Sequence, residues 1–324
     1  MSDAINVQLA KIQNAEVIQS QEINGALYRR FLAFLDASPE TIRAYSGNLR
    51  QFMMWLFVHD IQKPTRETII TYRDELKTKY KATTVQNYIE AVKLFFSWTS
   101  QEGLYPNIAD RIKGARITRE HKKDYLTSTQ ANAVLTGIDR STEQGLRDYA
   151  IICLAITGGL RVIEAYRANI EDLGKAGNAS ALYLQGKGRD EKAEFIKIPL
   201  EVEIAIRTYL KSRGKPAPKD PLFTSLSRNS KGRRLSRRSI SGIIKKHLIN
   251  AGYESDRLTA HSLRHSAVTI ALLEGSTLQE VQQFARHKNI STTQIYAHNL
   301  NREHSNCENS IANSIFKKGG NGIR

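Results

Sequence analysis

The 324-residue sequence has no long apolar run and only two cysteines. Its longest apolar stretch, residues 149–156, is short beside the roughly 18 or more apolar residues of a membrane-spanning helix. Residues 1–11 lack the basic and then apolar order of a secretory signal. Cys153 and Cys307 are too few and too far apart for a disulfide framework or a metal site. We therefore expect a cytoplasmic protein that does not act at a membrane.

Motifs for metals and nucleotide cofactors are also absent from the sequence. It has no carboxylate pair and no Cys/His cluster at the spacing of metal ligands, and it has no Gly-x-x-x-x-Gly-Lys-[Ser/Thr] loop for a nucleotide. We therefore expect neither a metal ion nor another cofactor in the chemistry of this protein.

Acidic residues are too few to balance the basic ones. There are 48 Lys and Arg residues against 32 Asp and Glu, which gives a formal net charge of +16 and a pI near 9.8. Residues 1–110 contain 12 of each sign, so the excess, 36 basic against 20 acidic residues, lies in residues 111–324. A solvated basic surface is one interpretation, but such a regional excess is more typical of nucleic-acid binding. We prefer this partner to an anionic membrane because no basic helix with a broad apolar face is present.

The N-terminal third predicts an all-helical domain. Residues 1–21 are polar and are expected to be a lead-in segment, and residues 22–110 carry apolar residues at helical spacing. Each pattern follows a residue that caps helices well: Ser38 with Pro39 at the first helical position, then Thr65, then Thr83 or Thr84. The predicted helices cover residues 39–56, 65–76 and 83–96.

A basic segment, residues 111–123, follows this domain and has almost no apolar periodicity. Such a composition predicts an exposed connector between domains. Its charge leaves two readings open, a solvated linker or a strap against DNA phosphates. Its DNA-binding candidates are Arg116, Lys122 and Lys123. Its six basic residues are Arg111, Lys113, Arg116, Arg119, Lys122 and Lys123.

Residues 124–300 predict a second domain that is mainly helical with a small β-sheet. A helix is expected after Thr127 or Ser128, and others at 146–156 and 201–211. Two short strands are expected at 181–184 and 195–198, joined by a polar loop that holds Lys187 between Gly186 and Gly188.

A second basic cluster lies in residues 222–250, which contain eight Lys and Arg residues and no acid. Arg233, Arg234, Arg237 and Arg238 come just before apolar residues at helical spacing. We expect this cluster to face DNA phosphates, because the N-terminus of a helix also favours anions.

Several residues in the second domain suit the transfer of a phosphoryl group. Arg161 follows Thr157-Gly158-Gly159-Leu160, and Arg264 lies within His261-Ser262-Leu263-Arg264-His265. Guanidinium groups clamp a phosphate well because they are planar, bidentate and always charged. Glu164 lies three residues after Arg161 on the same helical face and is expected to orient Arg161 or a neighbouring group. His265 is expected to be structural and to face away from His261 and Arg264.

The remaining motif is Ala285-Arg286-His287, which is followed nine residues after His287 by Tyr296. Arg161, Lys187, His261, Arg264, His287 and Tyr296, in this order, resemble the active site of the tyrosine recombinase, or phage integrase, family. The resemblance covers roughly residues 25–316. The sequence departs from the family where Gly158 replaces a frequent Thr and where Ala285-Arg286 replaces the usual Leu-Gly. Neither departure removes a catalytic side chain.

This resemblance implies a C-shaped clamp on DNA, with a helical SAM-like core-binding domain and a mixed α/β catalytic domain. It implies that Tyr296 attacks the scissile phosphate, that Arg161, Arg264, His261 and His287 surround that phosphate, and that Lys187 protonates the leaving 5′ oxygen. A free phenol has a pKa of about 10, so this attack needs a base or a cationic environment.

The implied function is a site-specific DNA recombinase with a 3′-phosphotyrosine intermediate and a free 5′ hydroxyl. We expect it to integrate or excise a mobile element, because the resemblance is close to the integrases of conjugative transposons and phages. A chromosome-dimer-resolving recombinase is the alternative. A type IB topoisomerase is disfavoured by the helical N-terminal domain and the tail. A non-catalytic DNA-binding repressor would not need the six-residue set.

Residues 301–324 are expected to be a tail that is exchanged between subunits. Ile311, Ile315 and Phe316 form a short apolar stripe beyond a polar stretch, residues 301–309, which predicts a flexible lead. The family resemblance implies a homotetramer on two double-stranded DNA sites, with an accessory directionality factor as a further expected partner.

Overall fold

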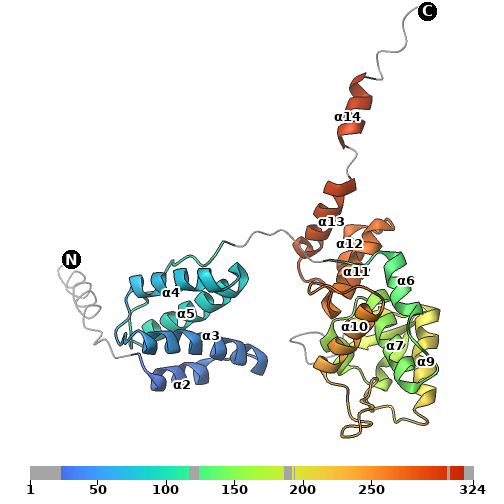
Figure 1. Ribbon diagram of the computed structural model, residues 1–324, viewed down its shortest axis with the longest axis horizontal. Coiled ribbons are helices and arrows are strands. Elements are labelled where there is room, and N and C mark those ends of the chain that lie inside the picture. The colour runs from blue at the N-terminus through green and yellow to red at the C-terminus, as the bar shows by residue number, and fades with distance from the viewer. Residues whose placement is uncertain (1–22, 117–123, 186–191, 193, 305–306, 317–324) are drawn as a thin grey trace, which may run out of the picture. The chain divides into compact units, whose positions relative to one another are not determined.

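The protein is described by a computed structural model that covers residues 23–116, 124–185, 192, 194–304 and 307–316. The chain divides into two compact units, Met1–Arg119 and Glu120–Arg324. Figure 1 draws both units, coloured along the chain. The predicted lead-in, residues 1–21, and the basic residues Arg119, Lys122 and Lys123 lie outside the described residues.

The first unit is a bundle of helices (Figure 1), and its core is rich in aromatic side chains. Phe31, Phe52, Tyr72, Phe95 and Phe96 are fully buried, and their rings contact one another across the helices. The described helices are α2 (Gly25–Phe34), α3 (Pro39–Val58), α4 (Arg66–Lys79) and α5 (Ala82–Gln101).

Local capping explains where two of these helices begin. The Ser38 hydroxyl accepts from the Thr41 amide at the start of α3, and Thr65 forms a capping box with Thr68 at the start of α4, as the sequence predicts. The predicted cap at Thr83 or Thr84 is wrong. α5 begins at Ala82 after an extended Lys81 that makes no side-chain cap, and the amides of Thr84 and Val85 donate to the Lys81 carbonyl oxygen instead.

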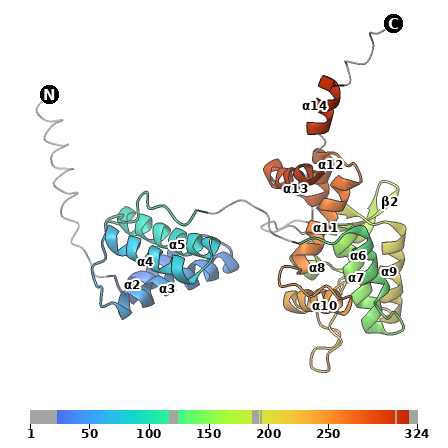
Figure 2. The same ribbon diagram turned by 45° about the horizontal axis from the view of Figure 1, so that its top comes forward.

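The second unit packs helices around α7, whose residues from Ala150 to Ile156 are all buried. Its sheet is antiparallel in the order β1-β2-β3, and Ser180 of β2 donates a hydrogen bond to Glu203 of α9 at 2.5 Å. Figure 2 shows β2 next to α9. The described elements are α6 (Ser128–Thr136), α7 (Glu143–Thr157), α8 (Val162–Arg167), a 3-10 turn η1 (Ile170–Asp172), β1 (Leu173–Ala176), β2 (Ala179–Leu184), β3 (Glu194–Lys197), α9 (Leu200–Ser212), α10 (Arg237–Asn250), α11 (Ala260–Leu273), α12 (Leu278–Ala285), α13 (Ile290–His304) and α14 (Cys307–Phe316).

The predicted fold class, mainly helical with a small sheet, is confirmed. The two predicted strands correspond to β2 and β3, which place Leu182 opposite Ile196. The predicted flexible lead at residues 301–309 is wrong for most of its length, because α13 continues to His304 and α14 begins at Cys307. In the part of the chain that the structure describes, no helix is long and apolar enough to cross a membrane.

Candidate active site

A tight glycine turn connects α7 to α8 and places Arg161 at the N-cap of α8. Gly159 has φ +55°, a left-handed conformation, and a Cβ there would lie 3.2 Å from the ring of Phe284. A Cβ on Gly158 would lie 2.9 Å from the Leu154 carbonyl oxygen. Both glycines are therefore needed for the chain to turn this closely against α7 and α12.

Glu164 binds Arg161 through both its backbone and its side chain. The Arg161 amide donates to Glu164 Oε2 at 2.8 Å, and Arg161 Nη1 donates to Oε1 at 2.7 Å. Glu164 is fully buried, and Arg161 keeps 29% of its side chain exposed. The predicted contact between these two residues is present, and it leaves the guanidinium open to a ligand on its solvent side.

Helix α11 supplies His261 and Arg264 from its first two turns. The Arg264 guanidinium is buried and donates to the carbonyl oxygens of Gly159 and Ala285. Burial, followed by the nearby Arg161 and Arg286, lowers the pKa of Arg264 to about 9, so it remains a cation at neutral pH. His261 is exposed at the surface of the same helix.

The expectation that His265 faces away from the site is wrong. Its side chain is buried, and its ring centroid lies 4.8 Å from that of Tyr296 and 4.9 Å from that of His261. His265 lies one position after Arg264, but the close packing of α13 on α11 brings the Tyr296 ring over it. His265 therefore forms one wall of the tyrosine's surroundings.

His287 follows the end of α12 and faces α13. Its Nδ1 lies 2.9 Å from the hydroxyl oxygen of Thr293. Burial lowers the pKa of His287 to about 4, helped by Arg264 and Arg161. A positive charge on this imidazole is costly among arginines, so His287 is neutral at pH 7.

Tyr296 lies on α13, and its ring lies close to those of His265 and His287. Its ring is nearly parallel to that of His287, with 6.1 Å between centroids. Burial raises the pKa of Tyr296, while Arg264 and Arg161 oppose that rise. The hydroxyl is therefore protonated at neutral pH and is surrounded by groups that favour its anion.

Arg286 is part of this site although the sequence prediction did not include it. Its guanidinium donates to Glu164 Oε2 at 2.9 Å and to the Gly159 carbonyl oxygen at 3.0 Å. The signal available in the sequence was an arginine at the end of a helix, immediately before His287, where glycine is the usual residue.

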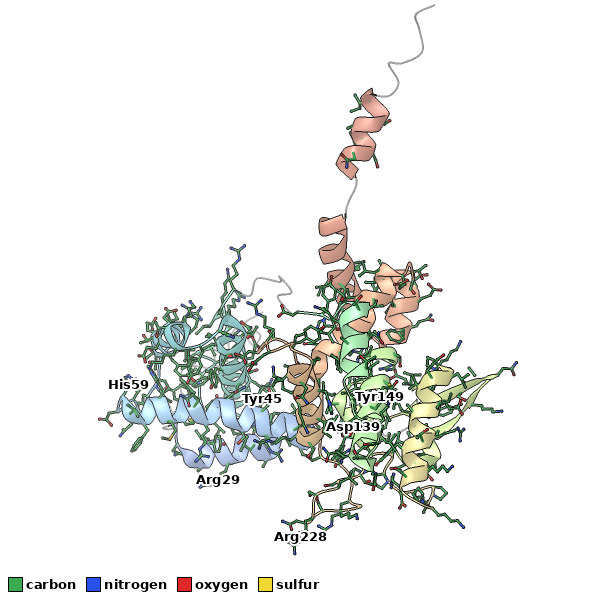
Figure 3. The ribbon with its side chains drawn as sticks, turned by 45° about the vertical axis from the view of Figure 1, so that its right-hand side comes forward. Arg29, Tyr45, His59, Asp139, Tyr149 and Arg228 are labelled. Carbon is green, nitrogen blue, oxygen red and sulfur yellow. The ribbon has the colours of Figure 1, made fainter. Side chains whose placement is uncertain are left out.

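Of the predicted DNA-binding residues, Arg116, Arg233, Arg237 and Arg238 are exposed. Arg237 and Arg238 start α10, as predicted, and Figure 3 labels Arg228 on the preceding loop, where its side chain points away from the helices. Arg234 is half-buried, and its prediction as a DNA-binding residue stays a prediction. Its guanidinium donates to the carbonyl oxygens of Tyr166 and Ala168 and to Asn169 Oδ1, so it ties this loop to the end of α8.

Three predicted residues, Lys187, Lys122 and Lys123, lie outside the described residues. Within residues 23–316, apart from the gaps given above, no group of three or more His, Cys, Asp or Glu side chains is placed to hold a metal ion. The described site is thus a cluster of arginines, histidines and one tyrosine around a buried glutamate.

Comparison with known proteins shows a family match over most of the chain. The phage integrase family model matches residues 124–303, and the model of the phage integrase N-terminal SAM-like domain matches residues 27–103. A tyrosine recombinase of Synechococcus elongatus is 29% identical over 275 residues, which are 80% of this chain and 84% of the relative. The tyrosine recombinase XerC of Pelobacter propionicus is 31% identical over 269 residues, 81% of this chain and 85% of the relative.

A solved structure shows the same fold. The XerH site-specific recombinase, in a post-cleavage complex with a palindromic difH substrate, has a TM-score of 0.71 at 20% identity, over 84% of this chain and 81% of that chain. The integrase family match alone covers more than half of the sequence. The chain therefore belongs to the phage integrase family of tyrosine recombinases, enzymes that cleave and rejoin DNA at specific sites.

Proposed function

We propose that Tyr296 is the nucleophile of this recombinase and that Arg161, Lys187, His261, Arg264 and His287 complete its catalytic set. The Tyr296 oxygen attacks the scissile phosphorus, the bond from phosphorus to the 5′ oxygen breaks, and a 3′-phosphotyrosine and a free 5′ hydroxyl result. The energy of the broken bond is kept in the covalent intermediate. The 5′ hydroxyl of a partner strand then attacks the phosphotyrosine and releases Tyr296.

The observation that carries this proposal is the position of Tyr296. Its ring lies 4.8 Å from His265 and 6.1 Å from His287, and buried Arg264 and part-buried Arg161 both favour its ionised form. Tyr72 has other surroundings: burial in the aromatic core of the first unit raises its pKa, and no arginine among the described residues opposes that rise. Tyr296 is therefore a tyrosine placed among histidines and close to two arginines that oppose the effect of burial on its pKa.

Arg161 and Arg264 supply the positive charge that the transition state needs. Each is fixed by bonds to the protein, Arg161 to Glu164 and Arg264 to two backbone carbonyl groups. Charge that is already oriented before reaction stabilises developing negative charge without reorganisation. His261 is exposed at the start of α11 and is proposed to donate to a non-bridging oxygen of the phosphate.

Two proton transfers accompany the step. His287 is neutral, and we assign it the tautomer in which Nδ1 donates to the Thr293 hydroxyl, so that Nε2 accepts the proton of the Tyr296 hydroxyl. Lys187 is assigned the proton for the leaving 5′ oxygen only by the family resemblance. A lysine ammonium suits this task because it can give up a proton when its pKa is lowered.

The wider assembly is also proposed. A net charge of +16 suits a double-stranded DNA partner, and Arg116, Arg233, Arg237 and Arg238 are proposed to contact its phosphates. Four copies would join two DNA sites, each passing its tail, residues 301–324, to a neighbour. The proposed location is the cytoplasm, because the substrate is DNA.

The test is the substitution Tyr296→Phe. The ring keeps its packing while the attacking hydroxyl is removed, so DNA affinity should stay nearly unchanged and covalent cleavage should be abolished. A substrate with a nick next to the cleavage site traps the wild-type adduct, and peptide mapping identifies the attached residue. An adduct on a different tyrosine would overturn the assignment.

Two biological roles fit this chemistry. Integration or excision of a mobile element, with an accessory factor to set direction, follows from the resemblance to element-borne integrases. Resolution of chromosome dimers is favoured by the similarity to XerC of Pelobacter propionicus at 31% identity. Footprinting on the DNA that flanks the gene separates them: protection beside the gene at an element boundary supports integration, and a site found only elsewhere in the chromosome supports dimer resolution.

A further inference from the structure

Arg286 has a left-handed backbone conformation that disfavours its own side chain. Its φ is 52° and its ψ is 46° at the end of α12, a position where helices most often have glycine. Two other non-glycine residues among those described, Asp60 and Arg111, have the same φ, and both are exposed. The side chain of Arg286 is only 4% exposed. Arg286 therefore differs from Asp60 and Arg111 in that its side chain is buried and contacts the rest of the protein.

The Arg286 guanidinium joins the end of α12 to the turn between α7 and α8. Nη1 donates to the Phe284 carbonyl oxygen at 2.8 Å, and Nη2 donates to the Gly159 carbonyl oxygen at 3.0 Å and to Glu164 Oε2 at 2.9 Å. Its backbone carbonyl oxygen accepts from Arg161 Nη2 at 3.2 Å. Residue 286 thus contacts Arg161 directly through its backbone and indirectly through Glu164.

Glu164 is shared between the two arginines. Its Oε1 accepts from Arg161 Nη1, while its Oε2 accepts from the Arg161 amide and from Arg286 Nη2. Burial by itself would raise the pKa of Glu164, but Arg286 and then Arg161 outweigh it and keep the pKa below its ordinary value. Glu164 is therefore a buried anion, and its negative charge needs a cation close by.

The charge balance of this cluster depends on Arg286. With Arg286 present, Glu164 and the two arginines sum to one positive charge, and Arg264 adds a second. Without Arg286, Arg161 would be the remaining partner of the carboxylate, and the pair would be neutral. A neutral pair attracts a phosphate much less than a cation does.

We propose that Arg286 is a positioning residue for DNA cleavage, one that neutralises Glu164 so that Arg161 is held in place while its positive charge remains available to the phosphate. This inference rests on the proposed role of Arg161. Arg286 does not touch the reacting atoms, and it acts through Glu164 and Arg161.

The experiment uses full-length Arg286→Asn and Arg286→Lys. Asparagine accepts the left-handed conformation but has no charge, whereas lysine keeps the charge and loses the planar contact. Single-turnover cleavage of a nicked site should fall on the order of 10²-fold for Arg286→Asn, the size of losing one preorganised group, and clearly less for Arg286→Lys. Affinity for the intact site should change little in both variants.

A double-mutant cycle with Glu164→Gln separates positioning from simple stability. In the Glu164→Gln background no buried anion requires neutralisation, so adding Arg286→Asn should slow cleavage far less than it does in the wild type. Arg111→Asn is a matched control, because Arg111 has the same φ and a 90% exposed side chain, and its thermal midpoint measures the generic effect of this replacement.

Each outcome decides the proposal. Equal cleavage by the Asn and Lys variants, or an equal effect of Arg286→Asn in both Glu164 backgrounds, would overturn it, as would a lower thermal midpoint with wild-type cleavage. If Arg286→Asn does not fold, the equally neutral Arg286→Gln in the two Glu164 backgrounds gives the same comparison. Failure of the proposed function is visible separately, because the wild type would then form no adduct on Tyr296.

Discussion

At the scale of single residues, two fixed arginine side chains influence the protonation of a neutral histidine and of the candidate tyrosine nucleophile. His287 and Tyr296 lie near the same two arginines, Arg161 and Arg264, with opposite effects. The arginines lower the pKa of His287 further than burial does alone, whereas they oppose the rise that burial causes in Tyr296. The arginines thus stabilise the phenolate and keep the imidazole neutral, so that it can accept a proton, although the same charges make a protonated His287 less stable.

The pH dependence of cleavage tests this arrangement. The ordinary pKa of a histidine is near 6.5. Because the pKa of His287 is lowered to about 4, its imidazole stays neutral as the pH falls from 8 to well below 6.5. The single-turnover cleavage rate should therefore show no loss centred at pH 6.5, and the loss on acidification should be centred below pH 5. The rates are measured where circular dichroism shows that the fold is intact, and His287→Gln is the control.

A fall in rate centred near pH 6.5 in the wild type, and absent in His287→Gln, would contradict the lowered pKa. The same shift affects stability with a defined sign. The unfolded chain binds this proton at a higher pH than the folded chain does, so the contribution of His287 to stability is complete above about pH 6.5 and is lost as the pH falls toward 4.

At the scale of elements, the turn between α7 and α8 brings the arginines together. The Gly159 carbonyl oxygen accepts from both Arg264 and Arg286, and Arg161 follows two residues later. The turn can approach α12 this closely because Gly159 has no side chain and tolerates a left-handed φ. A displacement of this turn would therefore move three guanidinium groups at once.

Gly159→Ala should lose more stability and activity than Gly177→Ala. Both glycines have similar left-handed φ values, +55° and +61°, so each alanine costs about 1–2 kcal/mol of backbone strain. A Cβ at 159 also meets the Phe284 ring at 3.2 Å, whereas a Cβ at 177 meets nothing within 4 Å. Urea unfolding and cleavage of a nicked site measure the two effects. Equal losses of stability, or wild-type cleavage by Gly159→Ala, would show that this contact is unimportant.

Local signals in the sequence predicted many elements but not their long-range contacts. The caps at Ser38 and Thr65 and the apolar face of α7 are local, and the structure contains all three. α2, α12 and β1 were missed: α2 buries only Leu27 and Phe31, α12 has only eight residues, and β1 has no alternating pattern. Each of these elements is too short, or buries too few side chains, to give a clear periodic pattern in the sequence.

The same limit applies to the site. Arg161 and Glu164 are three residues apart, and their contact follows from helical spacing. Arg286 reaches Glu164 across 122 positions in the sequence, and the ring of His265 meets Tyr296 only because α13 packs on α11. Residue order and family resemblance identified the candidate set, whereas the packing of α11, α12 and α13 determines which other side chains join it.

At the scale of the whole molecule, the second unit carries both the excess of basic residues and an exposed apolar stripe on its last described helix. The basic excess lies in residues 111–324, where Arg233, Arg237 and Arg238 are exposed. The last element described in the same unit is α14, a ten-residue helix that is too short to be stable alone in water. Its Ile311 and Ile315 lie four residues apart and are 58% and 63% exposed. An apolar stripe on such a helix is best stabilised by burial against another surface.

We expect this stripe to bind a neighbouring copy when two DNA sites are joined. The double substitution Ile311→Ser and Ile315→Ser should leave single-site binding intact, because the basic surfaces are unchanged. It should lower recombination between two sites by at least about tenfold, since fully burying each Ile contributes roughly 1.5–3 kcal/mol. Gel-shift titration on one site and a two-site recombination assay measure these quantities. Deletion of residues 304–324 should have the same effect.

A matched control lies on α9, where Leu200 and Ile204 are also four residues apart and are 67% and 56% exposed. Changing both to Ser removes a similar apolar stripe from a helix that is not proposed to bind a second copy. Recombination should then stay close to the wild-type rate. If the α9 and α14 variants lose recombination equally, or if the α14 variant still joins two sites as well as the wild type, the tail does not couple neighbouring subunits. Loss in the α14 variant alone would locate that coupling in Ile311 and Ile315.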